Sequence, residues 1–145
     1  MAVGTKRVTI QATYKGTNHS LDLARVTEVK ESEEIDSDVV KCFDGAVPVP
    51  SSDGGYSIDI STLEARDLNE FITLKRILKG LKTNPGTLSV YEDIKQSTGD
   101  FTTERHYQQV LISSNEVTLS AEDLTARDLS FTAGDCIEKV AGTEI

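Results

Sequence analysis

Polar and apolar residues alternate along several short stretches of this chain. Between Lys6 and Tyr14, for example, Val8, Ile10 and Ala12 share one face of an extended segment, and polar residues share the other. A period of two is typical of a strand with one buried face. Similar patterns predict strands over residues 6–14, 19–28, 56–61, 87–94, 107–113, 116–120 and 126–133. The chain is therefore predicted to be mainly β, and its first two strands form a hairpin through a turn at 15–18.

One segment changes to a helical period. A broad apolar stripe predicts a helix over residues 66–80, with a core-facing side made of Leu68, Phe71, Ile72, Leu78 and Leu81. Acidic residues lie near its start and basic residues near its end, as the helix dipole favours. Asn84-Pro85-Gly86 follows and prevents continuation. The helix is expected to cover the outer side of the sheet.

Residues 29–55 interrupt the strand pattern with an acidic cluster, two prolines and a glycine pair. A connection of about 25 residues is uncommon inside a compact domain. Apolar residues are spaced within it, at Val39, Val40, Phe43, Val47 and Val49. An exposed acidic loop has no use for these side chains, although that interpretation stays open. We therefore predict an extended assembly loop that docks on another subunit.

Length and charge limit the possible functions. The 145 residues fit a single domain, 1–145, and carry 24 acidic against 15 basic residues, for a net charge of −9. This balance does not favour tight binding of nucleic acid, which depends on Lys and Arg. No apolar run approaches the roughly 20 residues of a membrane span, and the start lacks the apolar core of a secretory signal. We expect no membrane partner, maturation in a cytoplasm, and free thiols at Cys42 and Cys136.

The sequence offers little support for catalysis. His19 and His106 lie in polar contexts without a neighbouring nucleophile, and are interpreted as surface residues. The acidic run 31–38 lacks the glycine and closing glutamate of a calcium loop. Motifs for nucleotide binding and for acyl transfer are missing. We predict no catalytic residues, no metal, no cofactor and no enzymatic activity.

The polar positions of the predicted strands are unusual. The side chains at these positions are small and either uncharged or acidic, and none is Lys, Arg or aromatic. The positions are Ser57, Asp59, Ser61, Asp128, Ser130 and Thr132. Such a face avoids both phosphate neutralisation and base stacking. It suits the wall of a conduit for nucleic acid. An ordinary solvent-exposed face of an acidic protein would also look like this.

In order and pattern, the chain resembles the bacteriophage tail tube protein family. The resemblance rests on the strand GGYSIDIS, the helix DLNEFITLKRILKG, the strand TLSVYEDI and the closing segment TARDLSFTAGDCIEKV, and covers residues 6–140. It implies a tail-tube-like β-sandwich or half-barrel with one flanking α-helix and a long inter-subunit loop. It also implies hexameric rings of this chain, stacked into a tube in the virion tail and assembled in the host cytoplasm. Sheath, baseplate and tape-measure proteins would be partners, and DNA would be a passing cargo.

Two other interpretations remain open. The haemolysin-coregulated tube proteins of type VI secretion resemble the same fold, although their motifs are not recognisable here. A small soluble β-barrel or sandwich that binds a ligand or partner belongs to a different class, and the apolar residues of 29–55 would then form a recognition loop. A subunit of a tube should form rings or tubes as concentration rises, whereas a binding module should stay monomeric.

Overall fold

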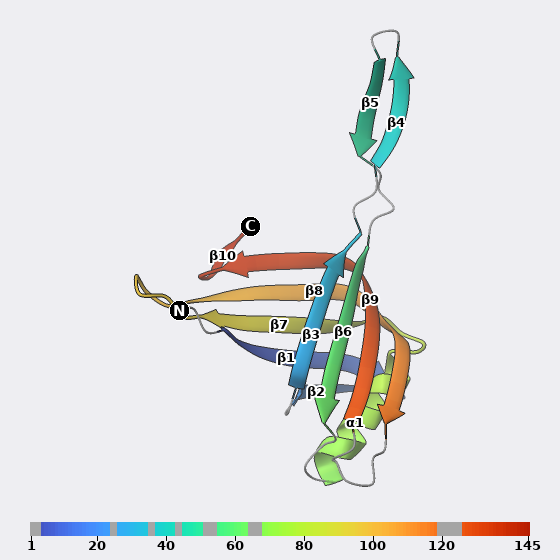
Figure 1. The fold of residues 1–145 in the computed structure, drawn as a ribbon. Coiled ribbons are helices and arrows are strands. Elements are labelled where there is room, and N and C mark those ends of the chain that lie inside the picture. The colour runs from blue at the N-terminus through green and yellow to red at the C-terminus, as the bar shows by residue number, and fades with distance from the viewer. Residues whose placement is uncertain are drawn as a thin grey trace.

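The computed structural model describes residues 4–23, 26–34, 37–42, 45–50, 55–63, 68–118 and 126–145. Figure 1 shows an arrangement of strands with one helix at one end and a hairpin projecting from the other. The elements are β1 (Gly4–Tyr14), β2 (Thr17–Leu23), β3 (Val26–Glu33), β4 (Ser37–Cys42), β5 (Gly45–Pro50), β6 (Tyr56–Leu63), α1 (Leu68–Gly80), β7 (Gly86–Ile94), β8 (Phe101–Thr118), β9 (Ala126–Val140) and β10 (Thr143–Glu144). The fold is mainly β, as predicted.

One antiparallel sheet runs in the order β2-β1-β7-β8-β9-β6-β3, with β10 added to β9. It is not closed, since β2 and β3 are its two ends. The long strands β8 and β9 connect two layers that cross each other in Figure 1. The first layer contains β2, β1, β7, residues 101–110 of β8, residues 134–140 of β9, and β10. The second contains β3, β6, residues 126–133 of β9 and residues 111–118 of β8. The molecule is a β-sandwich or half-barrel with a flanking helix.

Strand β8 passes from one layer to the other at a distortion. Gln109 has a positive φ of 55°, and the register with β9 shifts between Ile112 and Ser114. A bulge of this kind bends a strand without ending it. The prediction of two strands separated by a turn at 113–115 is therefore wrong, because the polar residues there belong to the bulge. Strand β9 also continues beyond Ala133, to Val140.

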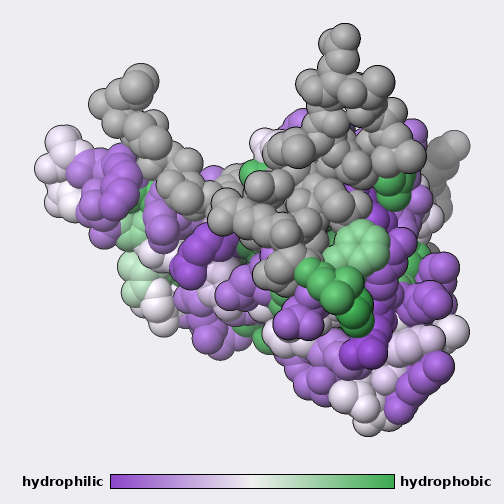
Figure 2. All heavy atoms as spheres, turned by 90° about the horizontal axis from the view of Figure 1, so that it is seen from below, coloured by the Kyte–Doolittle hydropathy of each residue, from purple (hydrophilic) through white to green (hydrophobic). Residues whose placement is uncertain are grey.

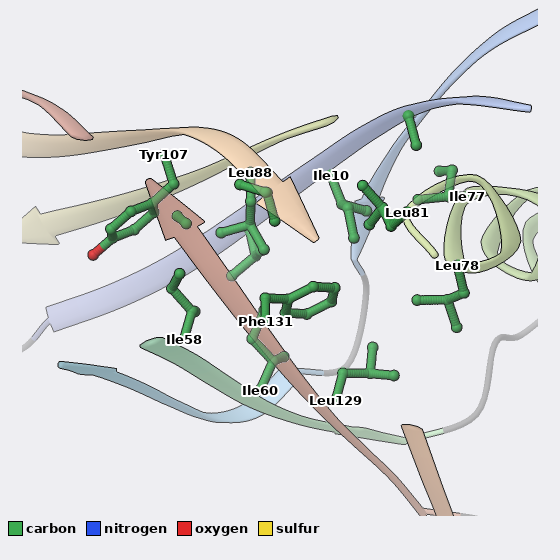
Figure 3. Packing of buried hydrophobic residues seen from close by; sticks show 14 of the residues in the cluster. Ile10, Ile58, Ile60, Ile77, Leu78, Leu81, Leu88, Tyr107, Leu129 and Phe131 are labelled. Atoms are coloured by element: carbon green, nitrogen blue, oxygen red, sulfur yellow. The ribbon is translucent and has the colours of Figure 1, made fainter. Parts of the chain in front are cut away.

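The core lies between the two layers and α1 (Figure 3). The first layer contributes Val8, Ile10, Leu88 and Val90; the second contributes Ile58, Ile60, Leu129 and Phe131; and the helix end contributes Leu74, Ile77, Leu78 and Leu81. Each is almost completely buried. Burying one such side chain is worth about 1.5–3 kcal/mol relative to leaving it exposed. The alternation in the sequence correctly predicted the buried face of β1, β6 and the first half of β9.

Helix α1 packs on β1 and β2 through its C-terminal half. The chain approaches β1 so closely that a Cβ at Gly80 would lie 2.6 Å from the carbonyl oxygen of Thr13. The predicted core face is only partly right. Leu78 and Leu81 are buried, but Leu68 is 71% exposed and Phe71 and Ile72 are half-buried. The apolar stripe is wider than the buried face of the helix, which consists of Leu74, Ile77, Leu78 and Gly80.

Residues 29–55 were predicted as an extended loop that interrupts the strand pattern, and the described part of this range contains strands instead. Residues 26–33 form β3, and 37–42 pair with 45–50 as a hairpin. The predicted second strand ends at Leu23 and does not reach residue 28. Strand β3 escaped the pattern because its inward position 31 holds a glutamate, which is half-buried and ion-paired instead of apolar. Within the described ranges, no helix is long and apolar enough to cross a membrane.

Candidate functional site

The polar face of the second layer gathers all six residues predicted to line a channel. Strands β6 and β9 pair in register, and the six form three cross-strand pairs: Ser57 with Thr132, Asp59 with Ser130, and Ser61 with Asp128. Neighbours such as Ile58 and Phe131 point the opposite way, into the core. The hydroxyl of Ser61 donates a hydrogen bond to Oδ1 of Asp128 at 2.8 Å. We call this surface the polar face.

The polar face extends onto both flanking strands. The registers add Glu28, Lys30 and Ser32 from β3, and Leu111, Ser114 and Glu116 from β8. The sequence patterns had suggested a surface without cations. Lys30, however, lies opposite Asp59, so the surface carries one ammonium group. Four exposed carboxylates against one ammonium give the polar face a net charge of −3. Its acidic character is kept.

Both edges of the second layer are open. Among the described strands, β3 pairs only with β6, and residues 111–118 of β8 pair only with β9. The N–H of Ile112 on the β8 edge donates to the carbonyl oxygen of Leu81 at 3.2 Å. Other backbone N–H and C=O groups along an open edge can pair with another strand. Leu111 and Val117, on the β8 edge, are 38% and 41% exposed. These edges are surfaces on which a second copy could add.

A polar cluster inside the half-barrel ties the β3 edge to the first layer. Arg105 of β8 donates from Nε and an Nη to the two oxygens of Glu31, at 2.5 and 2.7 Å, and Tyr107 donates its hydroxyl hydrogen to Glu31 at 2.7 Å. The ring of Tyr56 packs edge-on against Tyr107. Desolvation and the bond to Glu31 raise the pKa of Tyr107. The hydrogen bond to Glu31 also raises the pKa of Arg105. Sequence reasoning missed this cluster.

The first layer carries a histidine cluster on its outer face. Nδ1 of His106 lies 2.8 Å from Oγ of Ser89, and Nε2 lies 3.3 Å from a carboxylate oxygen of Glu104. Tyr91 packs edge-on against the imidazole, and Arg7 stacks on Tyr91. His106 is thus a half-buried, bonded residue of a sheet surface and not an isolated surface histidine. These contacts link β1, β7 and β8.

Metal binding finds no support in the described ranges, where no three His, Cys, Asp or Glu side chains are grouped to hold an ion. The thiol of Cys136 is free and partly buried. Desolvation raises its pKa to about 11, so the unreactive thiol form dominates near neutral pH.

The predicted assembly loop is a hairpin that projects away from the two layers (Figure 1). Strands β4 and β5 form their own two-stranded sheet, separate from the large one. The register puts Val40 opposite Val47, and Asp38 opposite Val49, while Val39 lies opposite Pro48. Phe43 lies outside the described residues. Backbone positions alone therefore place four of the five predicted assembly residues on the projecting hairpin.

No family model matches the sequence, and no curated protein matches it either. Solved structures do match its fold. The SPP1 tail tube aligns with a TM-score of 0.63 at 11% identity, covering 92% of this chain and 76% of the other. The chain has the fold of tail tube proteins.

Two further solved structures are similar to this chain in fold. A chain from the tail of an empty GTA particle, treated with C6 symmetry, aligns with a TM-score of 0.54 at 13% identity, covering 89% and 92% of the two chains. A chain of the PVC sheath–tube complex, from an extracellular contractile injection system, gives 0.56 at 10% identity, with coverage of 90% and 87%. The tail-tube fold is also that of Hcp proteins. The resemblance of this chain to phage tail tubes, which was predicted from the sequence, is confirmed at the level of the fold.

Proposed function

We propose that this protein is a structural subunit of a phage-type tail tube, and that its copies form stacked rings around a channel. The observation that carries the proposal is the second layer, which combines a polar face, a buried opposite face and two open edges. Such a layer is one segment of a larger closed sheet. Joining edges between copies removes the exposed edges that an isolated sheet must otherwise protect.

The strand count favours closure. The second layer has four strands that alternate in direction, in the order β3, β6, β9 and β8. In a cyclic ring every copy has the same orientation, so the β8 edge of one copy runs antiparallel to the β3 edge of the next. An even number of alternating strands therefore gives one continuous antiparallel sheet. We take six copies per ring, as in the C6 GTA tail whose fold is similar.

The polar face then lines the channel. The residues that would face the lumen are Ser57, Asp59, Ser61, Asp128, Ser130 and Thr132. They would be flanked by Glu28 and Lys30 on β3 and by Leu111 and Glu116 on β8. The net charge of −3 repeats around each ring. Charges within about one Debye length, roughly 8 Å at physiological salt, still repel a phosphate backbone. DNA would pass as a transient cargo during ejection without adhering.

This role sets the partners and the place of action. The main partner is a second copy of the same chain, within and between rings. The PVC sheath–tube complex, whose fold is similar, suggests a sheath as a further partner, and baseplate and tape-measure proteins belong to the same proposal. The subunit would act in a virion tail, after assembly in the host cytoplasm, as a structural protein without enzymatic activity.

Size-exclusion chromatography over a concentration series, followed by negative-stain imaging, tests the proposal. A tube subunit should give concentration-dependent oligomers, and images should show rings or tubes with a central channel. A monomer at every concentration would instead support the small binding module.

The likeness to Hcp proteins favours one second candidate, a tube of the type VI secretion kind that carries effector protein in place of DNA. Gene neighbourhood separates the two. Genes for capsid and tape-measure proteins beside this one support the phage tail, whereas type VI baseplate and membrane-complex genes support the alternative.

A further inference from the structure

The two open edges of the second layer are positioned by different means. Strand β8 runs from the first layer into the second, so its own backbone determines where the β8 edge lies. The bond from the N–H of Ile112 to the carbonyl of Leu81 adds a tie to the end of α1. Strand β3, by contrast, pairs only with β6 among the described strands, and residues 24 and 25 connect its start to β2 in the chain. Side chains must therefore hold the far end of β3 over the first layer.

Three polar side chains do this. The carboxylate of Glu31 accepts hydrogen bonds from Nε and an Nη of Arg105, at 2.5 and 2.7 Å, and from the hydroxyl of Tyr107 at 2.7 Å. Figure 3 shows this hydroxyl at the end of the core, pointing away from the apolar side chains. The side chains of Arg105 and Glu31 are 20% and 14% exposed, so water competes little for these bonds. We call the three residues the Glu31 cluster.

The Glu31 cluster supplies a direction that apolar contacts lack. The other inward residues of β3, Val26 and Val29, are partly buried against the core. Apolar burial is non-directional, so it tolerates a strand that slides or swings. A bidentate bond between guanidinium and carboxylate fixes both distance and angle. Arg105 is itself held, because its other Nη donates to the hydroxyl of Thr103 at 3.2 Å. The cluster therefore fixes the angle at which β3 crosses the first layer.

A small swing of β3 would change how a ring closes. Rings of five, six and seven copies need rotations of about 72°, 60° and 51° between neighbours, so an error of about 10° per copy changes the copy number. In a closed sheet, the tilt of the strands and their number are linked. Between residues 26 and 31 the strand spans about 17 Å at roughly 3.3 Å per residue, so a swing of about 10° moves Glu31 by about 3 Å. Such a shift would break hydrogen bonds of 2.5–2.7 Å.

The surface seen from the α1 end offers little else to orient a neighbouring copy. In that view the described residues present a largely hydrophilic surface with a small hydrophobic patch (Figure 2). Permanent subunit interfaces are usually more hydrophobic than this. The angle between copies then depends mainly on the strand edges.

We infer that the Glu31 cluster sets the angle of the β3 edge and thereby the number of copies at which a ring closes. The inference rests on the proposed tube, because it concerns how the rings of that tube close. Glu31, Arg105 and Tyr107 are positioning residues, since they lie inside the half-barrel and act on the next copy only through β3. Their contribution is to precision more than to stability, because apolar residues of similar volume often match a buried ion pair in stability.

A triple variant separates precision from stability. Glu31→Leu with Arg105→Met and Tyr107→Phe removes the polar groups of the cluster together, so that none is left buried and unpaired. The isolated subunit should unfold at a denaturant midpoint equal to or above the parental value. Its rings should vary in size, and the share with the parental copy number should fall about threefold, because neighbouring ring sizes become accessible.

Two further variants complete the experiment. Arg105→Lys keeps the positive charge but loses the two parallel donors, and it should also give rings of mixed size. It decides the question if the triple variant does not fold. Lys95→Ser with Asp100→Ser is the matched control, because it removes an exposed ion pair of 3.3 Å between β7 and β8, away from both edges of the second layer. Its rings should have the parental copy number.

Native mass spectrometry counts the copies in each ring, and end-on negative-stain images separate closed rings from open arcs. Rings of the parental copy number from the folded triple variant would overturn the inference, as would mixed rings from the control. A folded triple variant that forms no oligomers would also overturn it, because the cluster would then be needed for edge pairing itself and not for its angle. If the parental protein forms no rings, the proposed function itself fails.

Discussion

The hydroxyl of Tyr107 is held where only its neutral form is stable. It donates to Glu31 at 2.7 Å, and the residue is 3% exposed. Ionisation would bring two negative charges together in a desolvated site, which is why the pKa is raised above its ordinary value of 10.0. A group with a raised folded-state pKa stabilises the protein fully below the unfolded-state pKa. That stability is lost as the pH rises beyond it.

Tyr107 should therefore make the protein less stable above pH 10. The free energy of unfolding should fall by up to about 1.4 kcal/mol per pH unit more in the parent than in Tyr107→Phe. Near pH 7 the variant should be about 1–3 kcal/mol less stable, because Glu31 loses a hydrogen bond. Denaturant titrations between pH 8 and 11 measure both effects. They are best done in a Cys136→Ser background, since the thiol, with a pKa of about 11, titrates in the same direction. Equal slopes for both proteins would contradict the assignment.

Single residues were predictable where their pattern was local. Alternation with polar neighbours predicts that Val8, Ile10 and Phe131 are buried, and all three are buried in the structure. The bond between Glu31 and Arg105 joins residues 74 positions apart, and no local pattern reports it. Lys30 belongs to the polar face only because β3 pairs with β6. Strand pairing is a property of the tertiary fold, so these residues could not be assigned from the sequence.

At the scale of elements, α1 has two unequal faces. Leu78 is 2% exposed in the core, whereas Phe71 is half-buried on the other side of the helix, beside Lys75. Leu78→Ala should cost about 2–5 kcal/mol, as expected for a truncation in a packed core. Phe71→Ala should cost about 1 kcal/mol, because most of its lost contacts are with solvent-facing neighbours. Chemical denaturation of both variants provides the comparison. A larger loss for Phe71→Ala would place that ring in the core after all.

The hairpin should contribute to assembly and little to the stability of one subunit. Its strands pair only with each other among the described elements. Val40→Ser with Val47→Ser should therefore leave the melting temperature of the isolated subunit within about 2 °C of the parent, but prevent formation of long tubes. Thermal melting at a concentration below assembly and negative-stain imaging above it are the two measurements. A strongly lowered melting temperature would show that these valines belong to the subunit's own core.

Elements were predictable where period and boundary signals agreed. The helix was expected over 66–80 and occupies 68–80, because an apolar stripe is followed by Asn84-Pro85-Gly86. Strand β3 was missed because it lies at an edge, exposes one side and ion-pairs on the other. The continuity of β8 was missed because a bulge and a turn have the same polar composition. In both cases the deciding interaction is with a distant strand.

At the scale of the whole molecule, the two layers of the sheet have different roles in the proposed tube. In the proposed tube, the second layer forms the channel wall. Asp59→Lys with Asp128→Lys should still give tubes, since both side chains are exposed and outside the core. The wall would then bind DNA, and that binding should weaken steeply with salt. Tube co-sedimentation with a DNA fragment from 50 to 300 mM salt is the measurement.

A matched control for the channel variant changes the same charge elsewhere. Asp135→Lys with Glu144→Lys alters two exposed acids beyond the second layer. These tubes should bind DNA no better than the parent. If both variants bound DNA equally, net charge and not the channel wall would explain the effect.

A reconstruction of the assembled tube by cryo-electron microscopy tests the central claim most directly. The proposed tube predicts a closed antiparallel sheet around the channel in which β3 of each copy adjoins residues 111–118 of β8 of the next. Asp59, Asp128 and their strand neighbours should face the lumen. A lumen lined by β1, β2 and β7, with both aspartates on the outer surface, would contradict the assignment of the channel face, and a protein that never assembles would contradict the tube.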